Sequence, residues 1–486
     1  MGWFVADDAW LGRAVLQHGL AALYLVAFLV AARQGPALLG TRGLTPVPAL
    51  LARVSFAQAP SVFHWRWSDR TFVAVCWTGA ALAALTLTGA TARLPLVITM
   101  AVWLVLWALY LSVVNVGQLW YSFGWESLLC EVGMLAVFLG NASTAPSLLV
   151  LLLVRWLLLR LELGAGLIKM RGDRCWRDLT CLDHHHETQP MPGPLSWWFH
   201  HLPRPLHRIE VAANHVTQLV VPFGLFLPQP YAGAAAAVML LTQLWLVVSG
   251  NFAWLNWLAI VLAASVLPDA WWSALLPRPV ETWLVPTRVG ATPYPWVVGC
   301  ILLTAVIVVL SRGPVLNLVS PHQAMNASFG PWRVVNTYGA FGSVTKVRHE
   351  VVLEGAEEWG DDGEPVWQEY VFHGKPGPPG RWPRQFAPYH LRLDWLMWFV
   401  ALSRRYAHPW LPRLLRRLLE ADQQTLRLFA HDPFGGRRPL AVRAMLYRYR
   451  YTTWSELRAT GDCWHRHLAG PFAGPVTLET AEPPWW

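Results

Sequence analysis

Charged residues are scarce in this chain. Only 14% of its 486 residues are Asp, Glu, Lys or Arg, whereas a soluble globular domain carries about 25%. Hydrophobic residues make up 55%, and they include 31 tryptophans, a residue type suited to the membrane–water interface. A soluble protein of this length has no need of such an apolar excess, so the composition predicts a polytopic membrane protein.

The formal net charge is +9, but no basic domain stands apart from the apolar segments. The excess of positive charge, mostly arginine, therefore fits loops that face anionic lipid rather than a nucleic-acid surface. We expect membrane lipids as partners and no nucleic acid.

Sequence motifs of the common enzyme classes are also missing. The chain contains no GxSxG elbow, P-loop, Rossmann glycine pattern, HExxH helix or kinase signature. Its six cysteines do not form the paired CxxC pattern of a zinc site. We therefore favour a non-enzymatic function over an enzymatic one, and expect no metal and no resident cofactor, with a bound lipid left open.

Long apolar runs predict the membrane bundle. A spanning helix needs about 20 apolar residues, and roughly nine runs come close to that length. They cover residues 14–32, 72–90, 95–116, 127–139 with flanks, 147–168, 211–227, 231–248, 252–267 and 296–310. We assign residues 1–315 to this bundle, with a polar loop at 169–208.

The pattern changes after about residue 319. Residues 332–338, 343–353, 366–373 and 443–451 alternate like strands, and 391–402 and 411–428 read as helices. In the second strand, Val351 and Leu353 fall on one face, and Arg348 and Glu350 on the other. We assign 316–470 to a C-terminal extramembrane β-rich α+β domain, and 471–486 to a loose, Pro-rich tail.

Ionisable residues inside spans are costly and are functional candidates by default. Glu126 and Glu131 begin the fourth span, and the fifth contains Arg155, Arg160 and Glu162. Arg155, Glu162 and Lys169 recur every seven residues and share one stripe of that helix. We favour an ion-pair lock with Glu126 or Glu131 over a catalytic or transport role.

The polar loop after Lys169 reads RGDRCWRDLTCLDHHHETQPMP, residues 171–192. Three adjacent histidines point in different directions, so we favour loop residues satisfied by their neighbours over a metal site. Arg171 and Arg174 fit either a carboxylate or phosphate clamp or salt bridges to nearby aspartates. If this loop forms a catalytic site, the candidate catalytic residues are Lys169, Asp173 and His186.

Cys175 and Cys181 flank the WRDLT stretch of the loop. A disulfide between them requires an oxidising compartment, and a pair of free thiols is an equally good interpretation. On the next helix, Glu210, Asn214 and Gln218 lie on one face. They predict either hydrogen bonds between helices, which we favour, or one wall of a pocket.

Several long blocks resemble the lipase maturation factor family. These blocks are VGQLWYSFGWESLLCEVG (116–133), GAGLIKMRGDRCWRDLTCLDHHHETQPMP (164–192), NHVTQLVVPFGLFL (214–227), SGNFAWLNWL (249–258), VVNTYGAFGSVTKVRHEVVLEG (334–355) and APYHLRLDWLMWF (387–399). The resemblance implies a membrane-embedded folding factor whose C-terminal domain lies outside the cytoplasm and whose client is a secreted lipase-like protein.

The chain also departs from that family, because its loops are short and no KDEL-like signal precedes Trp486. Its Ala-, Arg-, Pro- and Trp-rich composition fits a bacterial homologue in the plasma membrane, whereas a eukaryotic one belongs in the endoplasmic reticulum membrane. The alternative function is an integral membrane enzyme that acts on a lipid, quinone or peptide. Its pocket lies between the 155–169 helix, the 169–187 loop and the 210–218 helix.

Overall fold

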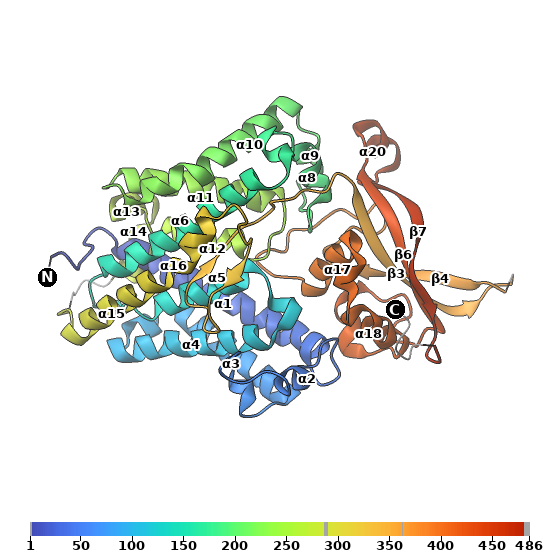
Figure 1. Ribbon diagram of the computed structural model, residues 1–486, viewed down its shortest axis with the longest axis horizontal. Helices are drawn as coiled ribbons and strands as arrows, with labels where there is room; N and C mark the ends of the chain where they lie inside the picture. The colour runs from blue at the N-terminus through green and yellow to red at the C-terminus, as the bar shows by residue number, and fades with distance from the viewer. Residues whose placement is uncertain (1, 286–289, 362, 481–486) are drawn as a thin grey trace.

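The chain folds into an elongated molecule, with a bundle of apolar helices at one end and a β-rich domain at the other (Figure 1). The computed structural model describes residues 2–285, 290–361 and 363–480. The bundle helices are α1 Trp10–Leu39, α3 Asp69–Leu87, α4 Leu96–Val116, α5 Gly124–Ala136, α6 Leu148–Arg171, α10 Arg204–Leu219, α11 Tyr231–Ser249, α12 Leu255–Ala264, α15 Tyr294–Leu310 and α16 Arg312–Val319.

Among the described residues, six helical segments are long and apolar enough to cross a membrane, or seven if one bent pair counts as a single span. This finding supports an integral membrane protein with a C-terminal domain, but it does not confirm nine spans. The helix α5 has 13 residues and is about 20 Å long, short of a ~30 Å hydrocarbon layer. The helix α6 is long enough, but it carries five charged residues, namely Arg155, Arg160, Glu162, Lys169 and Arg171.

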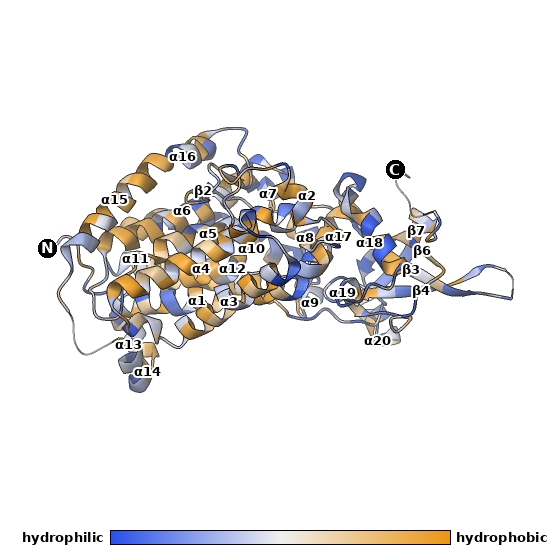
Figure 2. Cartoon of the chain, turned by 90° about the horizontal axis from the view of Figure 1, so that it is seen from below, coloured by the Kyte–Doolittle hydropathy of each residue, from blue (hydrophilic) through white to orange (hydrophobic). Residues whose placement is uncertain are grey.

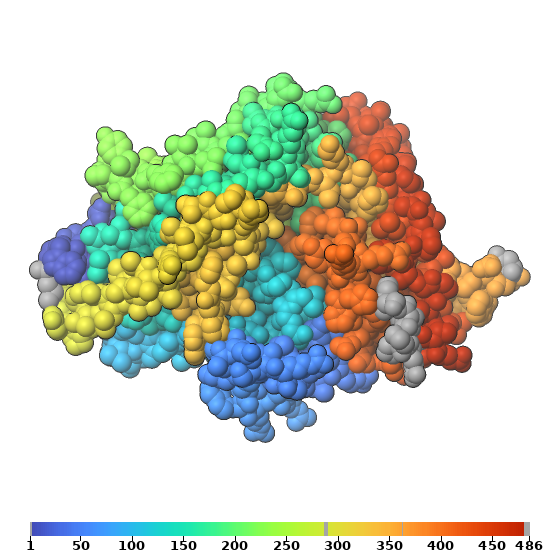
Figure 3. Space-filling view, in the orientation of Figure 1, coloured from blue at the N-terminus to red at the C-terminus, as the bar shows by residue number. Residues whose placement is uncertain are grey.

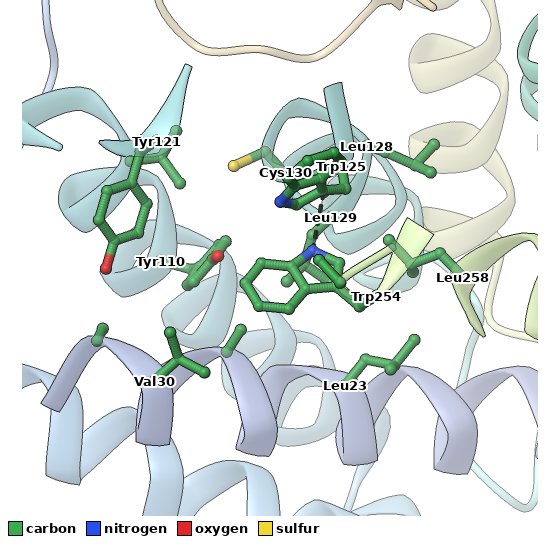
Figure 4. Close-up of a cluster of buried hydrophobic side chains, with 14 of the residues drawn as sticks. Leu23, Val30, Tyr110, Tyr121, Trp125, Leu128, Leu129, Cys130, Trp254 and Leu258 are labelled. Atoms are coloured by element: carbon green, nitrogen blue, oxygen red, sulfur yellow. Dashed lines mark hydrogen bonds between the residues drawn. The ribbon is translucent and has the colours of Figure 1, made fainter. Parts of the chain in front are cut away.

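The centre of the bundle is an aromatic core (Figure 4). Trp254, which precedes α12, is fully buried between Leu23 and Val30 of α1 and the start of α5. Its indole N–H donates to the carbonyl of Trp125 at 3.1 Å. Each buried ring removes a large apolar area from contact with polar surroundings, so the short helices α5 and α12 are held by packing on α1.

Short helices cover the C-terminal-domain end of the bundle. They are α2 Val47–Leu51 in the first loop, and α7 Arg174–Arg177, α8 Leu182–Thr188 and α9 Ser196–His200 in the polar loop. The strands β1 Ala327–Ser328 and β2 Asn336–Thr337 belong to the linker that follows α16. This linker, yellow to orange in Figure 3, crosses one face of the bundle toward the C-terminal domain.

The C-terminal domain contains a five-stranded antiparallel sheet in the order β5-β4-β3-β6-β7. Its strands are β3 Arg348–Trp359, β4 Pro365–Phe372, β5 Phe429–His431, β6 Ala441–Tyr451 and β7 Trp464–Val476. The helices α17 Arg392–Leu402, α18 Trp410–Leu419, α19 Gln423–Leu426 and α20 Trp454–Thr460 complete it. Hydrophilic residues are frequent in this domain, whereas hydrophobic residues dominate the bundle (Figure 2).

The structure adds to one expectation for this domain and corrects another. Arg348 and Glu350 were predicted on the face of a strand opposite Val351 and Leu353, and both are buried as well. The reason is that β3 is the central strand and is covered on both faces. The chain expected to be loose from residue 471 continues β7 as far as Val476, paired with Val442 of β6. The end of that predicted tail, 481–486, lies outside the described residues.

Candidate functional site

Glu131 of α5 is the centre of a buried polar group that joins the bundle to the linker. Arg160 of α6 forms an ion pair with it. Its second oxygen accepts hydrogen bonds from the backbone N–H of Asn336 at 2.9 Å and the hydroxyl of Tyr338 at 2.6 Å. The expected α6 partner, Arg155, lies five residues away and points to a different side of the helix.

Glu126 also pairs with an arginine, but not with one from the bundle. Its carboxylate binds Arg392 of α17 at 2.8 Å, and both side chains are completely buried. The hydroxyl of Tyr110 donates to the same carboxylate, and the guanidinium of Arg392 lies 3.4 Å from the ring centre of Tyr121. A buried charge is tolerated only when it is paired and hydrogen-bonded, so Arg392 ties the C-terminal domain to the bundle.

The predicted stripe of α6 makes separate contacts rather than one ion-pair row. Arg155 donates to the carbonyl of Leu225 at 3.0 Å. Glu162 accepts hydrogen bonds from Gln243 of α11 at 2.7 Å and from Gln218 of α10 at 3.3 Å. Polar side chains of three helices therefore meet around Glu162.

Lys169 ends this network. Its ammonium group donates to Asn214 at 2.8 Å and to Gln218 at 2.9 Å. Glu210, on the same helix, instead accepts from the indole N–H of Trp245 in α11 at 2.8 Å. The polar face of α10 is thus engaged with neighbouring helices, which is the arrangement expected of hydrogen bonds that hold helices together.

The start of the polar loop is fastened to the linker. Arg171 donates to Gln323 at 2.7 Å, and the carboxylate of Asp173 accepts from the backbone N–H of Val344 at 2.7 Å. Arg174 differs, because its side chain is 83% exposed and pairs with Asp178 one helical turn later. Arg171 and Asp173 therefore anchor the loop, and Arg174 does not.

A disulfide joins Cys175 and Cys181 in the structure. Trp176, inside the ring that the disulfide closes, donates its indole N–H to the carbonyl of Phe341 at 2.8 Å. The ammonium of Lys169 lies 5.0 Å from the same indole ring, a distance at which a cation–π attraction acts. The cross-linked ring thus packs on both the linker and the end of α6.

The three adjacent histidines have different surroundings. His184 is partly exposed, His185 stacks on Phe252, and His186 is buried against Phe199. Within the described chain, neither ring nitrogen of His186 has a hydrogen-bond partner. Burial lowers the pKa of His185 to about 4 and the pKa of His186 well below its usual value, so both rings are neutral near pH 7.

Arg348 of β3 reaches out of the C-terminal domain to the polar loop. Its guanidinium donates to the carbonyls of Glu187 at 2.8 Å and Gln189 at 2.6 Å, where α8 ends and carbonyls lack helical partners. The carboxylate of Glu350 pairs with this guanidinium and also with the ammonium of Lys375, so one buried anion is shared by two cations. Sequence reasoning missed these contacts, and the available signal was an Arg-x-Glu pair directly before the apolar residues 351–353.

The loop and the domain share further hydrogen bonds. The backbone N–H of Tyr451 in β6 donates to the carboxylate of Glu187 at 2.8 Å. The indole N–H of Trp197 in α9 donates to the carbonyl of Thr452 at 3.0 Å. The polar loop is therefore an adaptor, with the bundle and linker on one side and the β-sheet on the other.

The catalytic candidates Lys169, Asp173 and His186 occupy different parts of this adaptor. Lys169 binds α10, Asp173 binds the linker, and His186 packs among aromatic rings. No hydrogen bond joins any two of them in the part of the chain that the structure describes. This arrangement suits a scaffold that fixes two domains better than a shared reaction centre.

Fold and site together define an integral membrane protein whose buried ion pairs and adaptor loop hold a β-rich C-terminal domain against a helical bundle. Two family models match this architecture. The lipase maturation factor transmembrane domain matches residues 11–274, and the lipase maturation factor C-terminal domain matches residues 334–474. The chain belongs to the lipase maturation factor family.

Curated relatives are similar over nearly the whole chain. Lipase maturation factor 1 of Mus musculus is 41% identical over 97% of this chain and 88% of its own length. The Homo sapiens protein of that name is 40% identical over 98% and 89%, and lipase maturation factor 2 of Rattus norvegicus is 28% identical over 95% and 83%. No solved structure matches. The names of these relatives do not support the alternative function, that of an integral membrane enzyme.

Proposed function

We propose that this protein is a membrane-embedded factor that assists the folding and assembly of secreted lipases or related hydrolases. The similarity to lipase maturation factor 1 carries this proposal, because it covers 97% of the chain and therefore both domains and the adaptor between them. The client is a lipase-like secreted protein, and the function needs no metal or resident cofactor, although lipid surrounds the bundle.

The test is restoration of lipase secretion in mouse cells that lack lipase maturation factor 1. Expression of this chain should raise the specific activity of the secreted lipase, while the variant Arg348→Met, which detaches α8 from β3, should restore much less. Arg174→Ala, at an exposed arginine outside the junction, is the matched control. The proposal would be contradicted if the wild-type protein reached the membrane at normal abundance and lipase secretion were still not restored.

The C-terminal domain lies on the extracytoplasmic side in this proposal, at the plasma membrane of a bacterium or the endoplasmic reticulum membrane of a eukaryote. Two observations support that side. The disulfide in the adaptor loop fits an oxidising compartment, and the loop contacts the C-terminal domain directly. For the plasma membrane of a bacterium, a cysteine at exposed Ser455 should react with an impermeant maleimide added to sealed cells, and protection until lysis would contradict this side.

Nine crossings from a cytoplasmic N-terminus are part of the same proposal. The end of α1 contacts the C-terminal domain, since Gln34 donates to the carbonyl of His390 at 2.7 Å, and the adaptor contacts it too. An even number of crossings must therefore separate these three segments. Four helices after the first loop, α3 to α6, and four after the adaptor, α10, α11, α12 and α15, meet this requirement.

A further inference from the structure

The segment after α12 forms a helical hairpin that neither family model fully covers. It consists of α13 Asp269–Leu275 and α14 Arg278–Leu284. The transmembrane family model ends at residue 274, and the C-terminal model begins at 334. The hairpin lies at the end of the bundle opposite the C-terminal domain (Figure 1).

The hairpin runs across the bundle rather than along it. The axis of α13 is bent by 109° from that of α12. Asp269 fixes the turn, because its carboxylate accepts hydrogen bonds from the backbone N–H groups of Trp10 and Leu11, both at 2.9 Å. These two N–H groups open α1 and have no partner within that helix, so the hairpin is fastened to the first turn of a spanning helix.

Its two helices are also fastened to each other and to the side of the bundle. The hydroxyl of Ser273 in α13 donates to Glu281 in α14 at 2.7 Å. The ring of Trp283 lies 4.8 Å from the ring of His18 in α1. These contacts give the hairpin a fixed orientation on the bundle.

The outer surface of this element is apolar. Neither helix contains a buried residue, Leu275 is 70% exposed and Trp283 is 43% exposed. Arg278 at the start of α14 is exposed beside them. The adjoining end of α3 is also apolar: Trp283 lies beside Gly89, just after α3, and Leu85, one turn earlier in α3, is 49% exposed.

We propose that this hairpin lies in the lipid leaflet opposite the C-terminal domain, with Leu275 and Trp283 at the boundary of headgroups and acyl chains and Arg278 at the phosphates of anionic lipids. A short helical pair parallel to the membrane plane, with tryptophan and leucine below and a cation above, has the composition of an interfacial anchor. Continuity with the exposed apolar side of the spanning helix α3 identifies lipid as the occupant.

The test uses the full chain in nanodiscs, with an environment-sensitive NBD dye on a cysteine at position 275 (Leu275→Cys). The control is Asp361→Cys, near the exposed tip of the β3–β4 hairpin, which points away from the bundle (Figure 1). Lipids brominated near the headgroup end of the acyl chain should quench the label at 275 at least threefold more than the label at 361. Equal quenching at the two positions would overturn the proposal.

A second measurement tests whether Arg278 binds anionic lipid. The labelled Leu275→Cys protein with Arg278 intact should show stronger quenching in nanodiscs when phosphatidylglycerol replaces part of the phosphatidylcholine, and adding Arg278→Gln should abolish that difference. Undiminished dependence on phosphatidylglycerol in Arg278→Gln would overturn the role of Arg278. Elution volume on size exclusion, compared with the unlabelled protein, shows that each variant is folded.

Discussion

Arg392 and Glu126 are 266 residues apart in the sequence, yet their side chains form a fully buried ion pair at 2.8 Å. Arg392 opens α17 in the C-terminal domain, and Glu126 lies in the first turn of α5 in the bundle. The pair is thus shared between the two regions that the two family models describe separately. Stability of the bundle and docking of the domain should therefore depend on each other.

Removing one partner of this pair should destabilise the whole protein. Arg392→Met leaves the carboxylate of Glu126 buried without its cation, which costs about 3–5 kcal/mol. We expect a lower midpoint of thermal unfolding in detergent, and partial recovery in the double variant Glu126→Gln/Arg392→Met, because neither buried charge then remains.

The matched control is Arg416→Ala, which removes a half-exposed pair with Glu420. Such a surface pair contributes at most about 1 kcal/mol, so the midpoint should change little. If Arg392→Met unfolds at the same temperature as Arg416→Ala, the ion pair does not couple the two regions.

The helices of the bundle could be predicted from sequence because hydropathy acts locally. Each predicted apolar run overlaps a helix, and 391–402 coincides with α17 apart from one residue. The polar contacts could not be predicted in the same way, since a charged residue inside an apolar run does not identify its partner. Glu126 was expected to pair within the bundle, and its partner Arg392 lies in the other domain.

The burial of Arg348 and Glu350 in β3 could not be predicted either, for a different physical reason. Alternation along a strand assigns polar residues to solvent only when one face of the sheet is open. Here the adaptor loop closes that face, and Arg348 satisfies the free carbonyls of α8. The contact depends on a helix end more than 150 residues away in sequence, so no pattern within the strand could reveal it.

Loss of the disulfide should weaken the adaptor loop. The Cys175–Cys181 bond closes a short ring, and in the chain-entropy view it stabilises the fold by roughly 2–3 kcal/mol. Cys175→Ser/Cys181→Ser should therefore lower the unfolding midpoint and increase proteolysis between α7 and α8. Mass mapping without reductant should recover the 175–181 bridge from wild type, and free thiols at both positions would contradict the structure.

Acid should loosen the adaptor through its buried histidines. Burial lowers the pKa of His185 to about 4 in the folded protein, below the value near 6.5 of an unfolded histidine. The unfolded state therefore binds the proton more tightly, so this contribution is complete above pH 6.5 and falls between pH 6.5 and 4. The loss is at most about 1.4 kcal/mol per pH unit for this histidine.

Thermal unfolding at four pH values between 7.5 and 4.5 tests this dependence. His185→Phe, whose ring fits the aromatic contact with Phe252, should show a shallower decline than wild type, whereas His465→Phe, at an exposed position, should not. Other groups contribute to the total slope, and the burial-raised pKa of Glu187 acts in the opposite direction. The difference between wild type and His185→Phe isolates the histidine, and identical slopes would show that His185 is not protonated on unfolding.

Lys169→Met distinguishes a structural lysine from a reacting one. The substitution leaves the amide oxygens of Asn214 and Gln218 without the donor that they share, which costs about 1–3 kcal/mol for a buried group. If Lys169 only holds α6 against α10, secreted lipase activity should fall in proportion to the folded protein in the membrane, and low temperature should rescue both. Normal abundance and an unchanged unfolding midpoint, with lipase maturation abolished, would contradict the structural role and favour chemistry at Lys169.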